Sequence, residues 1–115
     1  MVRLNLTVIR SEEIHTSVKF YKQLGLKFEL HRHGKGPEHY ASLDTDTVFE
    51  IYPASEKFPV TIGSCIGFEV DSCEEVSGKL VEAGYTALTL PAESPWGVRA
   101  VFIDSDEHRV EIVSS

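Results

Sequence analysis

Residues 47–52 read Thr-Val-Phe-Glu-Ile-Tyr, and residues 109–113 read Arg-Val-Glu-Ile-Val. Each segment alternates apolar side chains with others around a single glutamate. This period of two is typical of a β-strand that buries one face. The alternation directs the apolar side chains to the buried face, and Glu50 and Glu111 to the opposite face. The chain therefore carries two similar strands, each with one carboxylate turned away from the core.

The residues before the first of these strands predict a complete structural unit. Residues 3–10 predict a strand, and the helix that follows ends at Gly25, a residue typical of the position after a helix. We expect Ser11 to cap this helix, because a serine oxygen accepts hydrogen bonds from the first turn. Two further strands are predicted at residues 26–31 and 38–43.

The second half of the chain repeats this order. A strand is predicted at residues 65–70, and Ser72 with Glu75 forms a capping box for a helix that ends at Gly84. Strands are then predicted at residues 86–90 and 98–103, with a loop at residues 91–97 between them. The strand at residues 109–113 ends this half. A fold built from two copies of one unit explains the repeated order.

The sequence predicts an α+β fold in which two βαβββ modules form a half-barrel cleft. The modules are residues 3–52 and 62–115, joined by residues 53–61, which contain two prolines and no period. A length of 115 residues fits a single domain. Pairing the two sheets would bring Glu50 and Glu111 into one cleft.

The composition excludes several classes of function. Eleven basic and 18 acidic residues give a net charge of −7, the opposite of what a nucleic-acid partner requires. No apolar run approaches the roughly 20 residues of a membrane span, and residues 1–10 lack the apolar region expected of a signal peptide. Cys65 and Cys73 form neither a disulfide framework nor a metal motif. We expect a cytoplasmic protein with a small-molecule partner, and with no nucleic-acid or membrane partner.

Two motifs resemble signatures of the vicinal oxygen chelate superfamily, which includes glyoxalase I, bleomycin-resistance proteins and extradiol dioxygenases. Phe-Tyr at 20–21 with Leu-Gly at 24–25 resembles the end of its first helix. Pro-Trp-Gly at 95–97 resembles its second signature, with Ser105 and Glu107 where proline and glycine are usual. The charged residues of that signature are also present, namely Arg99, Asp104, Asp106 and Glu111. The resemblance covers essentially the whole chain and implies the same duplicated fold.

In metal-dependent members of this superfamily, the first and last strands of each module supply the ligands. The last-strand positions match Glu50 and Glu111, but the first-strand positions match Leu6, or Asn5 after a slip of one residue, and Cys65. Leucine cannot bind a metal, and asparagine is a poor ligand for zinc, nickel or iron. The resemblance therefore implies no cofactor; a divalent metal, if bound, would use Glu50, Glu111 and Cys65.

Other residues are candidates for ligand binding. Tyr52 shares the strand face of Glu50. Arg10 either binds an anionic group or lies at the surface. His39 is either an ordinary surface imidazole, the interpretation we favour, or directs a donor into the cleft. Trp96 either covers the edge of the core, the reading we favour, or forms a flat wall for a ligand ring.

The other histidines are expected to be ordinary surface residues. His31 and His33 share a strand face at a spacing that suits chelation, but a polar hairpin more often carries solvated imidazoles. His15 is expected on the exposed side of the first helix, and His108 in a solvated hairpin.

Together these observations favour a small-molecule binding protein that resembles bleomycin-resistance proteins and needs no metal. The alternative is a metal-dependent lyase, isomerase or dioxygenase of the same superfamily with an atypical metal site. A dimeric scaffold without ligand chemistry is a third reading. We expect a homodimer, because open sheet edges and apolar faces need to be covered.

Overall fold

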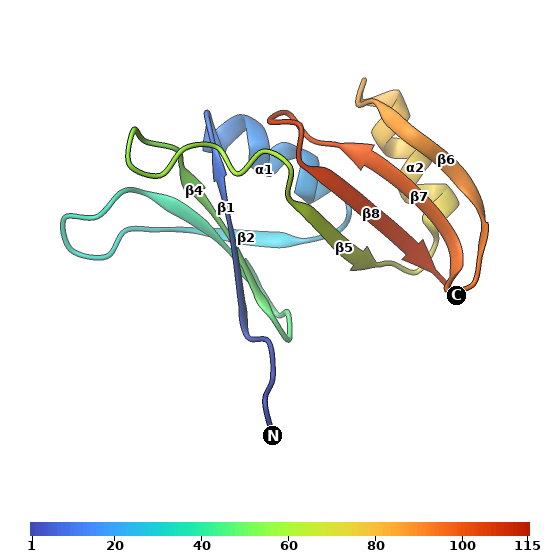
Figure 1. The fold of residues 1–115 in the computed structure, drawn as a ribbon, viewed down its shortest axis with the longest axis horizontal. Helices are drawn as coiled ribbons and strands as arrows, with labels where there is room; N and C mark the ends of the chain where they lie inside the picture. The colour runs from blue at the N-terminus through green and yellow to red at the C-terminus, as the bar shows by residue number, and fades with distance from the viewer. The chain divides into compact units, whose positions relative to one another are not determined.

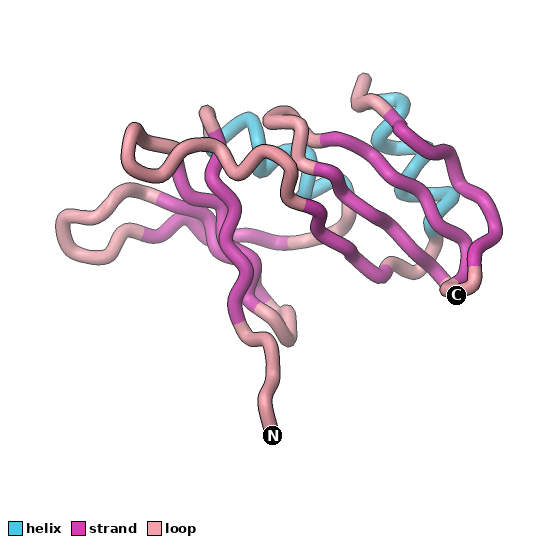
Figure 2. The backbone as a smooth tube through the Cα atoms, viewed as in Figure 1, coloured by secondary structure: helices cyan, strands magenta, loops and turns pink.

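The computed structural model describes residues 1–115 as two compact units, Met1–Thr61 and Ile62–Ser115. Each unit has the element order β-α-β-β-β, with one four-stranded sheet and one helix (Figure 1). Figure 2 shows the same division into helices, strands and loops. The predicted α+β fold of two βαβββ modules is confirmed, and each sheet is open rather than closed into a barrel. Neither helix has the length and apolar character needed to cross a membrane.

The first unit has strand order β1-β4-β3-β2. Its elements are β1 (Leu6–Ser11), α1 (Ile14–Gln23), β2 (Lys27–His31), β3 (His39–Leu43) and β4 (Val48–Pro53). β1 pairs with β4 in parallel, whereas the pairs β2–β3 and β3–β4 are antiparallel. The parallel pair requires a long crossover connection, and α1 with the following hairpin supplies it.

The core of this unit lies between α1 and one face of its sheet. Phe20 and Tyr21 of α1 are fully buried, and Tyr21 meets Phe49 of β4 edge to face, with ring centres 4.8 Å apart. Phe49 and Ile51 are buried, as their alternation with Glu50 predicted. The side chain of Glu50 therefore lies on the sheet face opposite α1, together with those of the residues two positions before and after it on β4.

The second unit repeats this arrangement with strand order β5-β8-β7-β6. Its elements are β5 (Cys65–Glu69), α2 (Cys73–Glu82), β6 (Ala87–Ser94), β7 (Gly97–Ile103) and β8 (Arg109–Ser114). The predicted cap of α2 is confirmed, since the Ser72 hydroxyl accepts the Glu75 backbone N–H at 3.2 Å. Val110 and Ile112 of β8 are fully buried and Glu111 is not, as the alternation predicted.

The start of the first unit differs from the prediction in two ways. β1 begins at Leu6 rather than at residue 3, because Leu6 pairs with Val48, the first residue of its only partner strand. Ser11 does not cap α1; it is the last residue of β1 and is buried. Glu13 takes the capping position, and its carboxylate accepts the backbone N–H of His15 at 3.0 Å. The pairing of β1 with β4 thus includes Ser11, although a serine at this place in the sequence is typical of a helix cap.

The predicted loop at residues 91–97 is mostly strand. β6 runs to Ser94 and β7 begins at Gly97, so only residues 95–96 connect them. Pro91 is tolerated because it lies within a register shift of β6, an edge strand, where the ladder of hydrogen bonds is interrupted. Pro91 therefore marks the irregularity in β6 correctly, but pairing with β7 continues the strand beyond Pro91 to Ser94.

Candidate ligand-binding site

The face of the first sheet opposite α1 gathers four of the candidate residues. The register pairs Arg10 with Tyr52 and Ala41 with Glu50. Side chains of directly paired residues lie on the same face of a sheet. His39 lies two residues before Ala41 on β3 and therefore shares this face. Three adjacent strands thus position the side chains of Arg10, Glu50, Tyr52 and His39.

A pocket of about 630 Å³ opens on this face, wholly within the first unit. Its volume is in the range of small-molecule sites. The strands contribute part of its lining, and the segment after β4 contributes the rest: Leu6, Val8, Arg10, Glu50, Tyr52 and residues 57–61. Residues 57–61 belong to the stretch that the sequence indicated only as a linker, so this half of the wall was missed. The one sequence feature that could have indicated a wall residue here is the aromatic Phe58, which lies between two prolines.

The Arg10 guanidinium lies between two aromatic rings. Its central carbon is 4.9 Å from the ring centre of Tyr52 and 4.6 Å from that of Phe58. Nη1 donates to the Pro53 carbonyl at 3.4 Å, and the Arg10 backbone N–H donates to the Thr61 hydroxyl at 3.0 Å. Cation–π contacts of this kind hold a charged group in place. Arg10 is therefore a fixed positive charge in the pocket wall rather than a free surface residue.

His39 lies beneath Tyr52. The two rings are stacked, with centres 4.1 Å apart and planes 8° from parallel. Nε2 of His39 lies 3.8 Å from the Glu50 carboxylate. Burial raises the pKa of Tyr52, the charge of Glu50 raises it further, and Arg10 opposes the shift. Tyr52 thus remains a neutral hydrogen-bonding group at physiological pH.

Glu111 occupies the corresponding place in the second unit and has a partner of its own. Each of its carboxylate oxygens lies 3.1 Å from a guanidinium nitrogen of Arg99 on the neighbouring strand β7. The hydrogen bond to Glu111 raises the pKa of Arg99. Glu111 therefore has a neutralising partner within its own unit. Sequence alternation placed the carboxylate, but it did not identify the arginine that faces it.

The residues at the four ligand positions implied by the resemblance do not fit a metal ion. Leu6 has no donor atom, and Cys65 is an exposed free thiol on β5. Glu111 is already held by Arg99 at both oxygens. Glu50 alone keeps a carboxylate that faces a pocket. Zinc sites and related sites require at least three good donors, which this set does not supply.

Two of the remaining expectations are wrong. Trp96 does not cover the edge of the core, because it lies in the β6–β7 turn with 71% of its surface exposed. His108 is fully buried rather than solvated, and its Nδ1 lies 2.9 Å from the Asp104 carboxylate. Asp104 also accepts the backbone N–H groups of Asp106 and His108 at 2.9 Å. The sequence feature that could have predicted this contact is the histidine four residues after Asp104.

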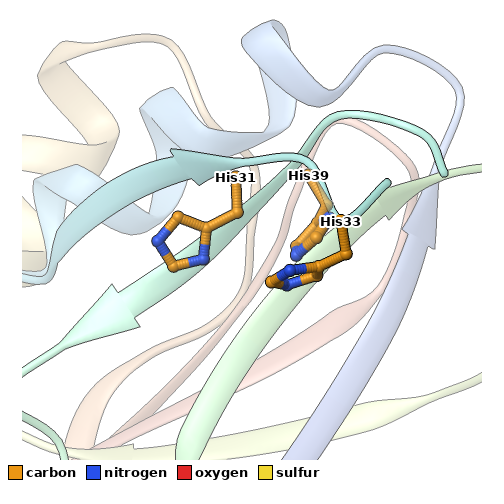
Figure 3. A group of neighbouring side chains, drawn as sticks. All are labelled: His31, His33 and His39. Atoms are coloured by element: carbon orange, nitrogen blue, oxygen red, sulfur yellow. The ribbon is translucent and has the colours of Figure 1, made fainter. Parts of the chain in front are cut away.

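The structure also brings His31, His33 and His39 together on the first unit (Figure 3). Their ring centres are 5.0 to 5.9 Å apart. His33 is exposed and His31 half-buried, but His39 is almost fully buried, so the interpretation of His39 as an ordinary surface imidazole is wrong. His15 is exposed as expected.

Solved structures share this fold at low sequence identity. TnmS3, an antibiotic binding protein from Streptomyces sp. CB03234, aligns with a TM-score of 0.82 and 17% identity over 99% of this chain and 96% of that chain. A superfamily member from Sphaerobacter thermophilus aligns with a TM-score of 0.80 and 18% identity over 100% of this chain and 98% of that chain. The oxidase ChaP-H2 aligns with a TM-score of 0.74 and 20% identity over 99% of this chain and 94% of that chain. A binding protein and an oxidase thus share the fold, which by itself assigns no activity.

The sequence itself assigns the family. No curated protein matches it significantly. The model of the glyoxalase/bleomycin resistance protein/dioxygenase superfamily matches residues 3–112, nearly the whole chain. The match agrees with the duplicated βαβββ units and with the motifs at residues 20–25 and 95–97. The chain therefore belongs to the glyoxalase/bleomycin resistance protein/dioxygenase superfamily.

Proposed function

We propose that this protein binds a small molecule in the manner of bleomycin-resistance proteins, with the pocket of the first unit as its binding site. The observation that carries the proposal is the pocket wall itself. It combines the rings of Tyr52 and Phe58, the Arg10 guanidinium and the Glu50 carboxylate around a volume of about 630 Å³. Aromatic surface with a few fixed polar groups is typical of ligand pockets.

The chemistry of the wall indicates the class of ligand. Tyr52 and Phe58 offer apolar ring surface, which suits a ligand with an aromatic or otherwise flat body. Glu50 offers a carboxylate to a cationic or hydrogen-bond-donating group. Arg10 is held rigidly between the rings and offers donors to an anionic group. Glu111 and Trp96, in the second unit, stay predictions as ligand contacts.

The proposal does not depend on the metal chemistry of the superfamily, because the four corresponding positions lack a suitable donor set. Both cysteines are free thiols, which agrees with the reducing, cytoplasmic compartment that we propose. The metal-dependent alternative requires an ion at Glu50, Glu111 and Cys65. Metal analysis of untagged protein purified without chelator tests it. Stoichiometric metal that disappears in both Glu111→Gln and Cys65→Ser would favour the alternative.

The binding proposal is tested by calorimetric titration with matched aromatic compounds that carry a cationic, a neutral or an anionic group. We expect the cationic compounds to bind, and Glu50→Gln to weaken them about tenfold, which corresponds to about 1.4 kcal/mol. Glu82→Gln, an exposed glutamate at the end of α2, is the control and leaves binding unchanged. Equal affinities in Glu50→Gln and the parent protein would contradict the assignment of Glu50.

A second variant tests the aromatic part of the wall. Phe58→Ala removes one ring from the Arg10 contact and from the pocket, and 48% of the Phe58 surface is exposed, so the core is untouched. We expect weaker binding of every aromatic compound irrespective of its charge, whereas Glu50→Gln acts on the cationic compounds alone. If Phe58→Ala has no effect on any compound, the ligand does not occupy this pocket.

A further inference from the structure

Three histidines meet where β2 passes into β3 at the edge of the first sheet. His31 ends β2 and His39 begins β3, and the register pairs them directly. His33 lies in the loop between these strands. One ring nitrogen from each residue lies within 4.8 Å of those of the other two. Figure 3 shows the three imidazoles grouped on one side of the strands, which is the arrangement a shared ion requires.

Existing contacts fix the proton on one nitrogen of two of these rings, which leaves a lone pair on the other nitrogen. Nδ1 of His39 lies 3.2 Å from the Pro37 carbonyl, which only accepts hydrogen bonds, so Nδ1 carries the proton and Nε2 keeps a lone pair. Nε2 of His31 lies 3.2 Å from the Glu29 carboxylate and donates to it, which leaves Nδ1 free. Metal-binding histidines characteristically donate their second N–H to a carbonyl or carboxylate in this way. Both rings are therefore held in the form that binds a metal.

The surroundings of the group favour a cation. The Glu50 carboxylate lies 3.8 Å from Nε2 of His39, and Glu29 contacts His31. The Tyr52 hydroxyl is 3.4 Å from Nε2, but the stacked rings place Tyr52 over the face of the imidazole, away from the in-plane lone pair. Two carboxylates thus border the cluster of imidazoles, and a divalent ion would gain from both.

We propose that His31, His33 and His39 form a binding site for a divalent transition-metal ion such as Zn²⁺. Imidazole nitrogens suit zinc, copper and nickel. Three histidines with one remaining position for water or a carboxylate match a known type of zinc coordination. Zinc–nitrogen bonds of about 2.0–2.1 Å require the three nitrogens to draw closer together. His33 is exposed and lies in a loop, so it is the residue free to close the site.

This site is separate from the metal position that the superfamily resemblance implies. None of its histidines occupies one of those positions, which fall on Leu6, Glu50, Cys65 and Glu111. The site also goes beyond the proposed function, because it requires no organic ligand. It borders the pocket through Glu50 and Tyr52, which line the pocket and contact His39. A bound ion would therefore lie next to the proposed ligand.

The test is calorimetric titration of the untagged, full-length protein with zinc chloride alone. We expect one ion per chain with micromolar or tighter affinity. His33→Ala and His31→Ala should each weaken binding at least about tenfold. His15→Ala is the matched control: this histidine is also exposed, contacts Tyr40 rather than the cluster, and its loss leaves zinc binding unchanged. His33 is exposed in a loop, so its replacement leaves the core intact.

A spectroscopic measurement makes the assignment independent of these variants. In ¹⁵N spectra of the histidine rings, zinc should shift Nδ1 of His31 and Nε2 of His39 and leave His15 and His108 unchanged. Absence of zinc binding, or unchanged affinity in either His33→Ala or His31→Ala, would overturn the site. Loss of zinc in both Glu111→Gln and Cys65→Ser would instead place the ion at the superfamily position. Because no organic compound is added, failure here leaves the proposed pocket function untouched.

Discussion

At the scale of single residues, the two cysteines differ sharply in their surroundings. Cys73 is fully buried at the start of α2, and its thiol donates to the Ile112 carbonyl at 3.5 Å. Burial raises the pKa of Cys73, the Ser77 hydroxyl lowers it, and the charge of Glu74 raises it. Cys65 is exposed on the edge strand β5. The thiolate is the nucleophilic form of cysteine, so both burial and a raised pKa suppress the reactivity of Cys73.

We therefore expect a disulfide reagent such as Ellman's reagent to modify Cys65 rapidly in the native protein and Cys73 only slowly. Release of the coloured thiolate measures both rates at neutral pH. In denaturant both cysteines should react at similar rates, and Cys65→Ser should abolish the fast native phase. Two fast equivalents in the native protein would show that Cys73 is accessible.

Gly97 is a second residue whose environment makes a quantitative prediction. It begins β7 with φ of +121°, a conformation that side-chain-bearing residues rarely adopt, and an added Cβ would collide with the Ser114 backbone carbonyl. We expect Gly97→Ala to reduce the free energy of unfolding by about 1–3 kcal/mol. Gly78 lies exposed within α2 with open space around it, so Gly78→Ala should raise stability by about 0.5–1 kcal/mol. Urea unfolding measures both changes, and equal midpoints for the two variants would contradict this reading.

At the scale of elements, one aspartate organises the turn between β7 and β8. The Asp104 carboxylate accepts the backbone N–H groups of Asp106 and His108 and the ring N–H of His108. Both Asp104 and His108 are buried, so removing the carboxylate deletes hydrogen bonds that water does not readily replace. The corresponding turn of the first unit, between β3 and β4, has Asp46 exposed instead.

We expect Asp104→Ala to destabilise the protein by about 3 kcal/mol, because it removes the carboxylate that accepts the hydrogen bonds holding the turn, two of them from the buried His108. Asp46→Ala should change stability by less than about 0.5 kcal/mol, as is usual for an exposed position. Thermal and urea unfolding compare the two variants directly. Similar losses in both would show that the Asp104–His108 pair contributes little to stability.

At the scale of the whole molecule, we predict that the protein is a homodimer. β1 and β2 are the edges of the first sheet, and β5 and β6 are those of the second. Large apolar side chains are exposed in both units, including Leu6 and Leu43 in the first and Leu88 and Leu90 in the second. Exposed strand edges with apolar residues favour association. Light scattering should give the mass of two chains, and a monomer mass across micromolar concentrations would contradict the prediction.

The features that the sequence determined by itself depend on local physics. Alternation with a period of two is a property of the strand, so it separated Phe49 and Ile51 from Glu50 without knowledge of any partner. The cap of α2 by Ser72 and the positive φ of Gly25, which follows α1, also depend on neighbours a few residues away. The repeated element order and the superfamily followed from these local patterns.

Other features were decided only by tertiary structure, because their contacts join residues far apart in the chain. Phe58 contacts Arg10 only because the segment that follows β4 in the sequence folds back to β1. Residues 57–61, which show no periodicity, therefore form part of the pocket wall. Ser11 was drawn into β1 by pairing with β4, which left Glu13 to cap α1. The partner of Glu111 and the grouping of His39 with His31 depend on strand register, which side-chain packing across the whole sheet sets.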